Sequence, residues 1–317
     1  MERFLCGVDI GGTKLSAGLI RQDGSIYDKV TIYDHVEKKE HVLVEMITGI
    51  IKDLCTRNEL KEPDLLGIGI GFPGHVRYRD GTVITTSNLK GYKNFPLKKA
   101  IQDNFNIPVI LDNDTNAQAF AEFKYGAGRK YDSLIFLTIS TGIGTGIILD
   151  RKLYRGITGT AGEVGHTIVD PHSSLKCTCG NYGCLMALAC GLAIPFLVKK
   201  KLDEGIKTNM PLPDDLNNID GRNIKQGLES GDRMAESIIS ECADYIGIGI
   251  YNIFQVFNPP AIIIGGGLCS WGKDYIDRIK NKFMSLARDM IYDPIDIRES
   301  ELGSDAGLIG AATLLLE

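Results

Sequence analysis

This sequence lacks long hydrophobic runs and long runs of positive charge. No stretch approaches the roughly 20 apolar residues of a membrane-spanning helix, and no run of Lys and Arg is longer than Lys199–Lys201. The net charge of −5 leaves little to hold a nucleic acid backbone. A strand-like apolar pattern starts at Phe4, which leaves no room for a signal peptide. We therefore expect a cytoplasmic protein whose partners include neither a membrane nor a nucleic acid.

Two common nucleotide-binding patterns are also absent. The glycine-rich turns match neither the Walker pattern nor the Rossmann fingerprint, because no helix pattern follows them directly. This argues against a P-loop enzyme and against a nicotinamide-dependent oxidoreductase. The chain does have length and apolar content, since 317 residues that are 44% hydrophobic fit two domains of about 150 residues.

The eight cysteines divide into two groups. Five of them lie in apolar surroundings typical of reduced, packed thiols: Cys6, Cys55, Cys190, Cys242 and Cys269. The other three, Cys177, Cys179 and Cys184, lie within eight residues and follow His166. One imidazole and three thiolates are the donor set of a closed tetrahedral Zn²⁺ site, which predicts a structural metal in 163–184. The alternative is a set of ordinary buried thiols beside a loop histidine.

The pattern of strand, glycine-rich turn and strand occurs twice. The first turn, 11–14, reads Gly-Gly-Thr-Lys, and the second, 141–145, reads Thr-Gly-Ile-Gly-Thr. Either can be an ordinary tight turn, or bare backbone that approaches a phosphate while Asp9 meets its Mg²⁺. The repetition predicts an internal duplication, in which two like domains hold a nucleotide between their turns.

The predicted strands 64–72 and 108–111 are apolar runs of the kind found in parallel sheets. In open α/β sheets, ligands bind beyond the carboxyl ends of such strands. Gly74, just after the first strand, and the polar stretch 112–116, after the second, are therefore candidates for ligand binding. Asn88, in the polar loop between them, joins these candidates. His75 is expected to be a plain loop residue.

The polar stretch 112–116 reads Asp-Asn-Asp-Thr-Asn. Short carboxylate and amide side chains suit a sugar, whose hydroxyls need acceptors and donors at fixed angles. A helix is predicted over 117–125, so Asp114 or Thr115 could instead be its N-cap. Capping needs one such residue and five polar ones are present, which favours a sugar site that includes Asn113 and Asp114.

The rest of the chain is predicted to be mainly helical. Helices are expected over 187–202, 223–228, 232–257, 271–288 and 306–316, with strands at 261–264 and 295–298. Gly265, Gly266 and Gly267 follow the first of these strands. Their bare backbone can lie against an adenosine, or it can allow close helix packing. The small residues of the last helix suit packing on the first sheet, which predicts discontinuous domains.

Five short motifs in this order resemble the ROK family of bacterial sugar kinases, relatives of the actin/hexokinase ATPases. They are Asp9-Ile-Gly-Gly-Thr-Lys14, Asn113-Asp114, Gly142-Ile-Gly144, Glu163-Val-Gly-His166 and Cys177-x-Cys-Gly-x-x-Gly-Cys184. The resemblance covers the whole chain, and the cysteine motif joined to Glu-x-Gly-His is its most specific part. It implies an α/β, two-lobed actin-like or ribonuclease H-like ATPase fold with duplicated domains around a central cleft. We expect one lobe at 1–115 plus about 300–317 and the other at about 116–299.

The resemblance also implies roles for individual residues. Asp114 matches the catalytic base, and Asn113 matches a neighbouring sugar ligand. Glu163 and His166 match residues that hold sugar hydroxyls, and His166 is also a zinc ligand with Cys177, Cys179 and Cys184. The segments that match the binding of ATP are Asp9, Gly11, Gly12, Thr13, Lys14, Thr141, Gly142, Gly144, Gly265, Gly266 and Gly267.

One position departs from the family pattern. Met186 stands where the motif Gly-Cys-Leu-Glu has a sugar-binding glutamate, so one hydrogen bond to the substrate is expected to be missing. An apolar, flexible methionine could tolerate a larger substituent at C2 of the sugar, or it could be a plain loss.

The implied function is phosphoryl transfer from Mg²⁺·ATP to a hexose hydroxyl. Glucose, giving glucose 6-phosphate, is the first expectation, because the chain resembles the family's glucokinases along most of its length. N-acetylmannosamine or another N-acetylhexosamine comes second, and fructose or mannose third. Repressors of the family carry an N-terminal helix-turn-helix, whereas the Asp-Ile-Gly-Gly-Thr turn starts here at residue 9. We therefore expect a kinase in preference to a repressor, and the presence of Asp114 favours an enzyme over a non-enzymatic sugar sensor. The resemblance also implies a homodimer or a higher homo-oligomer.

Overall fold

The computed structural model describes residues 3–33, 35–86, 89, 91–291, 293 and 295–317. These residues form two compact units. The first contains the chain up to Phe136 with Gly146–Gly162 and Ser300–Glu317, and the second contains Leu137–Thr145 and Glu163–Glu299. Each unit is therefore built from separate stretches of the chain.

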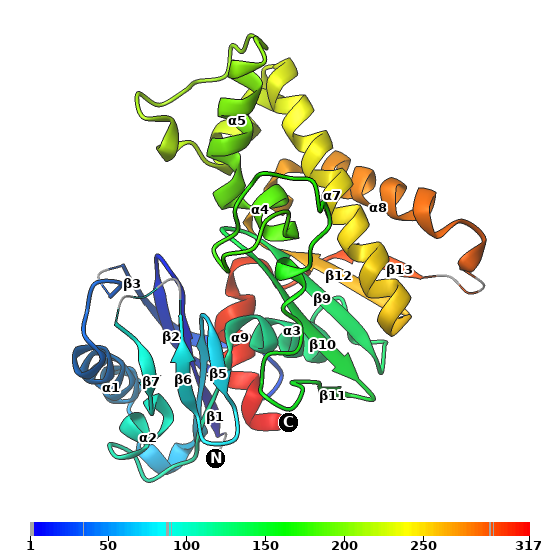
Figure 1. The fold of residues 1–317 in the computed structure, drawn as a ribbon. Coiled ribbons are helices and arrows are strands. Elements are labelled where there is room, and N and C mark those ends of the chain that lie inside the picture. The colour runs from blue at the N-terminus through cyan, green and yellow to red at the C-terminus, as the bar shows by residue number, and fades with distance from the viewer. Residues whose placement is uncertain (1–2, 34, 87–88, 90, 292, 294) are drawn as a thin grey trace. The chain divides into compact units, whose positions relative to one another are not determined.

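A five-stranded sheet forms the centre of the first unit (Figure 1). Its strands are β1 (Phe4–Ile10), β2 (Leu15–Ile20), β3 (Ile26–Ile32), β4 (Leu65–Phe72) and β8 (Val109–Asn113). The order is β3-β2-β1-β4-β8, with antiparallel pairing from β1 to β3 and parallel pairing from β1 through β4 to β8. The predicted hairpin and parallel strands are confirmed. Asp9, Gly71 and Asp112 are consecutive neighbours across the carboxyl ends of the parallel strands.

Helices cover both faces of this sheet. They are α1 (Glu40–Arg57), α2 (Leu97–Gln102), α3 (Asp114–Tyr125) and α9 (Ala306–Thr313). α1 buries an apolar stripe at helical spacing in the core on one face. On the other face, Leu308 and Ala312 of α9 pack on Leu5 of β1. A Cβ on Gly7 would collide with the Leu308 carbonyl oxygen, so the close approach of α9 to β1 requires glycine there.

α3 lies against α9 and the segment that leads to it. A Cβ on Gly310 would collide with the Ala117 backbone. The fully buried Glu122 of α3 accepts hydrogen bonds from Ser300 Oγ at 2.6 Å and from the Leu302 amide at 2.9 Å. Because α3 is bonded to the returning segment in this way, the first unit extends past the boundary expected after residue 115.

A three-stranded sheet in the first unit was not expected from the sequence. It consists of β5 (His75–Arg77), β6 (Thr82–Thr85) and β7 (Lys93–Phe95), paired antiparallel in that order. The turn between β5 and β6 contains Gly81, which has φ +67°, and the Asp80 carboxylate accepts from the Thr82 amide at 3.2 Å. Strands of three or four residues are too short to show a period of two.

The second five-stranded sheet repeats the strand order of the first. Its strands are β9 (Leu134–Ile139), β10 (Ile143–Leu149), β11 (Lys152–Leu153), β12 (Ala261–Gly265) and β13 (Asp296–Glu299). The order β11-β10-β9-β12-β13 matches β3-β2-β1-β4-β8 strand for strand. In both sheets the outer hairpin pair is antiparallel and the last pair is parallel. The duplication predicted from the two glycine turns is confirmed.

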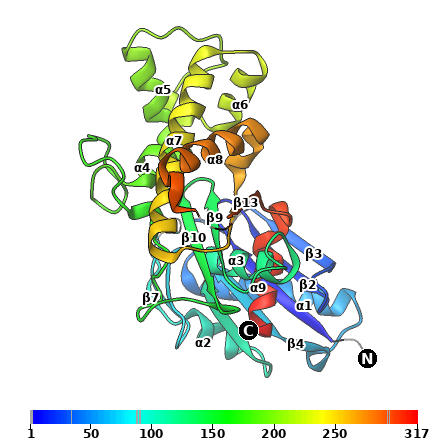
Figure 2. The same cartoon turned by 90° about the vertical axis from the view of Figure 1, so that its right-hand side faces the viewer.

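The helices of the second unit are α4 (Leu185–Ala189), α5 (Ile194–Asp203), α6 (Gly221–Glu229), α7 (Arg233–Phe257) and α8 (Lys273–Ala287). α8 runs beside α7 (Figure 2). The N-cap of α7 is Asp232, whose Oδ1 accepts from the Met234 amide at 2.9 Å, and its C-cap is Asn258, which has φ 41°. In the described parts of the chain, no helix combines the length and the apolar character needed to cross a bilayer.

The single helix predicted over 187–202 is wrong. Cys190 is extended, with φ −106° and ψ 177°, and separates α4 from a short 3-10 turn that leads into α5. The amide of Gly191 donates to the Ser140 carbonyl at 2.7 Å instead of continuing the helix. A Cβ on Gly191 would lie only 2.8 Å from that oxygen. The chain therefore leaves the helix in order to pack on the second glycine turn.

Candidate functional site

Asn113 caps α3 and leaves Asp114 at its first helical position. The Asn113 Oδ1 accepts from the amides of Thr115 at 2.9 Å and Asn116 at 3.2 Å. The alternative that Asp114 or Thr115 is the N-cap is therefore wrong. Asp114 is half-buried, and its Oδ1 accepts from the Thr115 amide at 2.8 Å. A carboxylate at this position is favoured by the helix dipole.

Gly74 lies against the β8–α3 junction, the point at which Asn113 ends β8 and Asp114 begins α3. The Asn113 Nδ2 donates to the Gly74 carbonyl at 3.0 Å. Gly74 has φ +118°, and a Cβ there would lie 2.5 Å from the Thr85 carbonyl oxygen, so only glycine fits. His75 begins β5 and pairs with Thr85, which corrects its assignment to a loop. Asn88, the other candidate in this part of the chain, lies outside the described residues.

Asp9 and Asp114 lie on two sides of Gly71. A Cβ on Gly71 would lie 3.4 Å from the Asp114 Cα and 3.8 Å from the Asp9 Oδ1. A Cβ on Gly307, in the first turn of α9, would collide with the Asp9 carboxylate. Burial raises the pKa of Asp9 to about 6, and the charge of Lys14 opposes this rise. The first unit therefore brings two of the predicted carboxylates to one edge of its sheet.

The first glycine turn is held by a histidine that the sequence analysis missed. The amide of Gly11 donates to the Lys14 carbonyl at 2.8 Å. The fully buried His35 places its Nε2 2.7 Å from the Gly11 carbonyl oxygen. Gly12 and Thr13 are exposed, so their amides and the Thr13 hydroxyl can reach a phosphate. No local pattern marks His35, because it follows Gly11 by 24 residues.

The second glycine turn, 141–145, lies beside Gly265–Gly267 at the end of β12. The amide of Ser140 donates to the Gly142 carbonyl at 2.8 Å. A Cβ on Gly267 would lie 3.6 Å from the Ser140 Oγ. Gly266 has φ +98°, and a Cβ there would collide with the backbone of β9. Close packing therefore requires Gly266, while the exposed faces of Gly266 and Gly267 also leave bare backbone for a ligand.

Four side chains of the second unit converge on one point. The ligand atoms of His166, Cys177, Cys179 and Cys184 all lie within 4.8 Å of one another. The Sγ atoms of Cys179 and Cys184 are 3.7 Å apart, and Cys177 Sγ lies 3.4 Å from His166 Nδ1. An S–S bond is about 2.05 Å, whereas two thiolates on one tetrahedral zinc with bonds of about 2.3 Å are about 3.8 Å apart. The spacing therefore fits a shared metal ion better than a disulfide.

Residues 163–184, here called the cysteine loop, bend sharply enough to bring the three thiols together. Gly180 has φ +94° and Gly183 has φ +68°, and a Cβ on Gly183 would collide with the Asp170 carbonyl oxygen. The amide of Cys177 donates to the Asn181 carbonyl at 2.7 Å. Burial, followed by hydrogen bonds with its neighbouring thiols, raises the pKa of Cys184 to about 12. A cation bound to the thiols would reverse this effect by stabilising the thiolates.

His166 turns its two ring nitrogens to different neighbours. It ends the 3-10 turn Val164–His166, whose N-cap is Glu163. Nδ1 faces the Cys177 thiol at 3.4 Å, and Nε2 lies 4.0 Å from the Glu163 carboxylate. A carboxylate behind a metal-bound histidine orients the ring and raises its basicity. The geometry therefore makes Nδ1 the nitrogen that would bind a metal ion shared with Cys177, and it leaves Nε2 on the side of the exposed Glu163.

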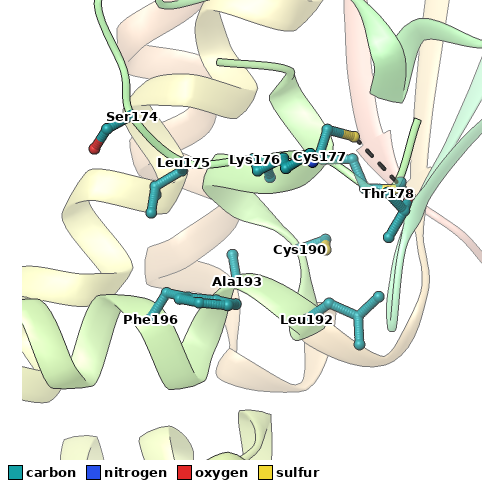
Figure 3. A pocket seen from close by; sticks show the side chains of 11 residues that line it. Ser174, Leu175, Lys176, Cys177, Thr178, Cys190, Leu192, Ala193 and Phe196 are labelled. Atoms are coloured by element: carbon teal, nitrogen blue, oxygen red, sulfur yellow. Dashed lines mark hydrogen bonds between the residues drawn. The ribbon is translucent and has the colours of Figure 1, made fainter. Parts of the chain in front are cut away.

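A cavity of about 270 Å³ lies beside the cysteine loop (Figure 3). Met186 is one of the residues that line it. The walls are mostly apolar and include Leu175, Cys177, Cys190, Leu192, Ala193 and Phe196. A Cβ on Gly142 would lie 3.2 Å from the Met186 sulfur. The residue that departs from the family pattern therefore lies between the cysteine loop and the second glycine turn.

A model of the ROK family matches residues 5–317 of this chain. The chain belongs to the ROK family. The glucokinase of Halalkalibacterium halodurans is 30% identical over 99% of this chain and 95% of its own length. A xylose repressor of Caldicellulosiruptor bescii is 33% identical over 86% of this chain and 69% of its own length. The ROK family resemblance drawn from the five motifs is confirmed.

A solved ROK structure shares the fold. The crystal structure of a ROK family glucokinase from Streptomyces griseus, in complex with glucose and AMPPNP, superposes with a TM-score of 0.83 at 32% identity. The match covers 98% of each chain. The predicted α/β actin-like ATPase fold of the ROK sugar kinases is confirmed.

The ROK motifs mark Asn113 and Asp114 but not the residues that hold them in place. Asp112 is 2% exposed, and its carboxylate accepts from Arg155 Nε at 2.6 Å. The two residues are 43 positions apart. Arg155 lies outside the five motifs quoted from the sequence, and the folded chain reveals this pair.

Proposed function

We propose that this protein transfers a phosphoryl group from ATP to a hydroxyl of a hexose, with glucose as the first candidate. The observation that carries the proposal is the place of Asp114. It is a half-buried carboxylate at the first position of α3, separated from Asp9 by Gly71 at the carboxyl edge of the sheet. The similarity to a named glucokinase, and to a glucokinase structure that holds glucose and AMPPNP, supports it.

In this mechanism Asp114 accepts the proton of the attacking hydroxyl. General-base assistance of this kind contributes about 10²–10⁴-fold to the rate. Asn113 donates one of its two amide hydrogens to Gly74 and keeps the other for a sugar hydroxyl. The carboxylate and the amide are fixed by the cap of α3, so the hydroxyl meets groups that are already oriented.

The glycine turns are proposed to hold the phosphates, and Gly265–Gly267 the adenosine. Backbone amides at Gly12 and Gly142 and the side chain of Thr13 are donors for phosphate oxygens. Asp9 is the residue that would hold the Mg²⁺ that accompanies ATP, and an ion of this kind neutralises charge on the phosphates. With a pKa of about 6, Asp9 is ionised at neutral pH.

We propose Zn²⁺ as the metal of the His166, Cys177, Cys179 and Cys184 cluster. Three thiolates and one imidazole fill a tetrahedral site and leave no open position, so the ion has a structural role. It would fix the segment that carries Glu163 and His166, which are proposed to bind sugar hydroxyls. Loss of the metal would therefore weaken sugar binding before it weakens nucleotide binding.

The identity of the sugar depends on the surroundings of Met186. Glucose is preferred on overall similarity, and N-acetylmannosamine or another N-acetylhexosamine is the alternative, followed by fructose and mannose. Met186 cannot accept or donate a strong hydrogen bond, and the cavity next to it is lined mainly by apolar groups. The apolar surroundings of Met186 are the reason why the larger N-acetylhexosamines stay candidate substrates beside glucose.

The test is a panel of hexoses and N-acetylhexosamines at fixed Mg²⁺·ATP, with each product identified by mass spectrometry and NMR. We expect glucose to give the highest kcat/KM and glucose 6-phosphate to be the product. Phosphorylation of an N-acetylhexosamine alone would replace glucose with the alternative substrate. Sugar binding with no transfer to any of them would favour a sugar-sensing role, as the similarity to a xylose repressor allows. A cytoplasmic location and a homodimer stay predictions.

A further inference from the structure

Arg155 is held between two carboxylates in the first unit. Its Nε donates to Asp112 Oδ2 at 2.6 Å, and its Nη1 donates to the Glu317 side chain at 2.9 Å, with a second bond from Nη2. The guanidinium also lies over the ring of Tyr78, 3.7 Å from the centroid. The side chain is only 12% exposed. A planar group with this many fixed partners has one orientation.

Asp112, one of the two carboxylates bound to Arg155, also accepts hydrogen bonds from residues on both sides of Asp114. Asp112 Oδ1 accepts from the Asn113 amide at 2.7 Å and from the Asn116 Nδ2 at 3.0 Å. These two donors flank Asp114 in the chain. Burial raises the pKa of Asp112, and Arg155 and Asn116 lower it again by stabilising the carboxylate. Asp112 is therefore the point through which Arg155 acts on the β8–α3 junction.

We propose that Arg155 is a positioning residue for phosphoryl transfer: through Asp112 it fixes the junction that presents Asn113 and Asp114 to the sugar. This inference rests on the proposed kinase function. Arg155 itself is not assigned to the reacting atoms. Its contribution is geometric, and a displacement of about 1 Å in a catalytic group can cost about 10²-fold in rate.

The chain contains a matched control four residues earlier. Arg151 donates to Asp132 at 2.6 Å and lies over the Phe123 ring, 5.3 Å from its centroid. It therefore has the same kinds of partner as Arg155. Its pair is exposed, with side-chain exposures of 62% and 74%. Arg151→Met removes an arginine, a carboxylate contact and an aromatic contact without touching the junction.

The experiment compares Arg155→Met, Arg155→Lys, the double variant Asp112→Asn/Arg155→Met and the control Arg151→Met in the full chain. For each variant we measure kcat, KM for ATP and for the sugar, and hydrogen exchange of the amides in 109–120. The double variant removes both buried charges, while the side-chain carbonyl introduced by Asp112→Asn can still accept from the junction. The double variant therefore shows whether a loss of kcat comes from an unpaired buried charge that disturbs folding or from the loss of the arginine that positions the junction.

If Arg155 positions the β8–α3 junction, kcat should fall about 10–100-fold in Arg155→Met while KM for ATP changes less than about twofold. Junction amides should exchange about tenfold faster, and Arg151→Met should match the wild type in both measurements. The double variant should melt at a higher temperature than Arg155→Met, because Asp112 no longer leaves a buried charge unpaired, yet it should keep the low kcat. Arg155→Lys should recover only part of the rate, because a lysine cannot make the planar contacts.

Two results would overturn the inference. One is a double variant with wild-type kcat, because Arg155 would then only neutralise a buried charge. The other is junction exchange in Arg155→Met no faster than in Arg151→Met. If the wild-type protein transfers phosphate to no sugar, the proposed function fails, and the exchange measurement still decides whether Arg155 holds the junction.

Discussion

The β8–α3 junction of the first unit and the cysteine loop of the second unit hold their predicted site residues by different means. At the junction, Asn113 caps the helix and a 2%-exposed Asp112 accepts from both sides of Asp114. In the cysteine loop, Cys179 and Glu163 are exposed, and two bends depend on glycines with positive φ. The junction carries its own hydrogen-bond network, whereas the loop brings four side chains that could hold a metal ion close together.

This difference separates two functions that a sugar kinase needs. The rate of transfer should depend on the junction, which the protein alone holds in place. The affinity for the sugar should depend on the loop, whose geometry the proposed metal ion would complete. Substitutions in the two regions should therefore give different kinetic signatures.

The largest effect is expected at the junction. Asp114→Asn should lower kcat by about 10²–10⁴-fold and leave sugar affinity within a few-fold, because the amide occupies the same space but accepts no proton. Steady-state kinetics and isothermal titration with the sugar measure the two quantities. The control is Asp103→Asn, an exposed carboxylate paired with Lys99. Turnover near the wild-type value in Asp114→Asn would reject this residue as the base.

Cys179→Ser tests the loop in the same way. It should lower the bound metal and weaken sugar affinity by about 10–100-fold, the cost typical of disturbing a metal site. Nucleotide affinity should change little, because the glycine turns make none of the metal contacts. Metal analysis and titration with sugar and nucleotide measure these effects. The control is Cys55→Ser, a half-buried thiol outside the cluster. A fully active, metal-depleted wild-type protein would contradict a structural role for the ion.

His35→Ala extends the comparison to the first glycine turn. Loss of the hydrogen bond from His35 to the Gly11 carbonyl should loosen the turn and raise KM for ATP about fivefold, the equivalent of about 1 kcal/mol. The sugar KM should stay close to the wild-type value. His35→Gln, which keeps a donor, should recover part of the affinity, and the exposed His41→Ala is the control. Equal changes in both KM values would show a general loss of structure.

The smallest effect concerns the pH dependence of stability. The folded-state pKa of Asp9 is about 6, above its ordinary value of 3.8, because burial disfavours the charge. Its contribution to stability is therefore present below about pH 4 and is lost as the pH rises through 6. Asp9→Asn should raise the melting temperature by about 2 °C at pH 7 and by less at pH 5. Melting curves without nucleotide or Mg²⁺ at the two pH values measure this, and an equal shift at both would contradict it.

Local patterns explain which parts of the site could be predicted. The four proposed metal ligands lie close together in the chain, and their donor chemistry is readable without the fold. Asn113 and Asp114 follow a strand whose apolar run identified it as parallel. The wrong predictions concern features that depend on distant residues. The helix break at Cys190, for example, depends on a hydrogen bond between Gly191 and the distant Ser140. β5, β6 and β7 are too short for any periodic signal.

The sequence by itself determined the duplicated strand and turn pattern, the donor set of the proposed metal site and the two carboxylates at strand ends. Each of these depends on residues that are neighbours in the chain, so local chemistry was enough. Only the tertiary structure decided which cap α3 uses, what holds the first glycine turn and what holds Asp112. His35 acts across 24 residues and Arg155 across 43, and Arg155 reaches Glu317 across 162. Partners so far apart are brought together by the packing of the sheet and helices, which no local pattern encodes.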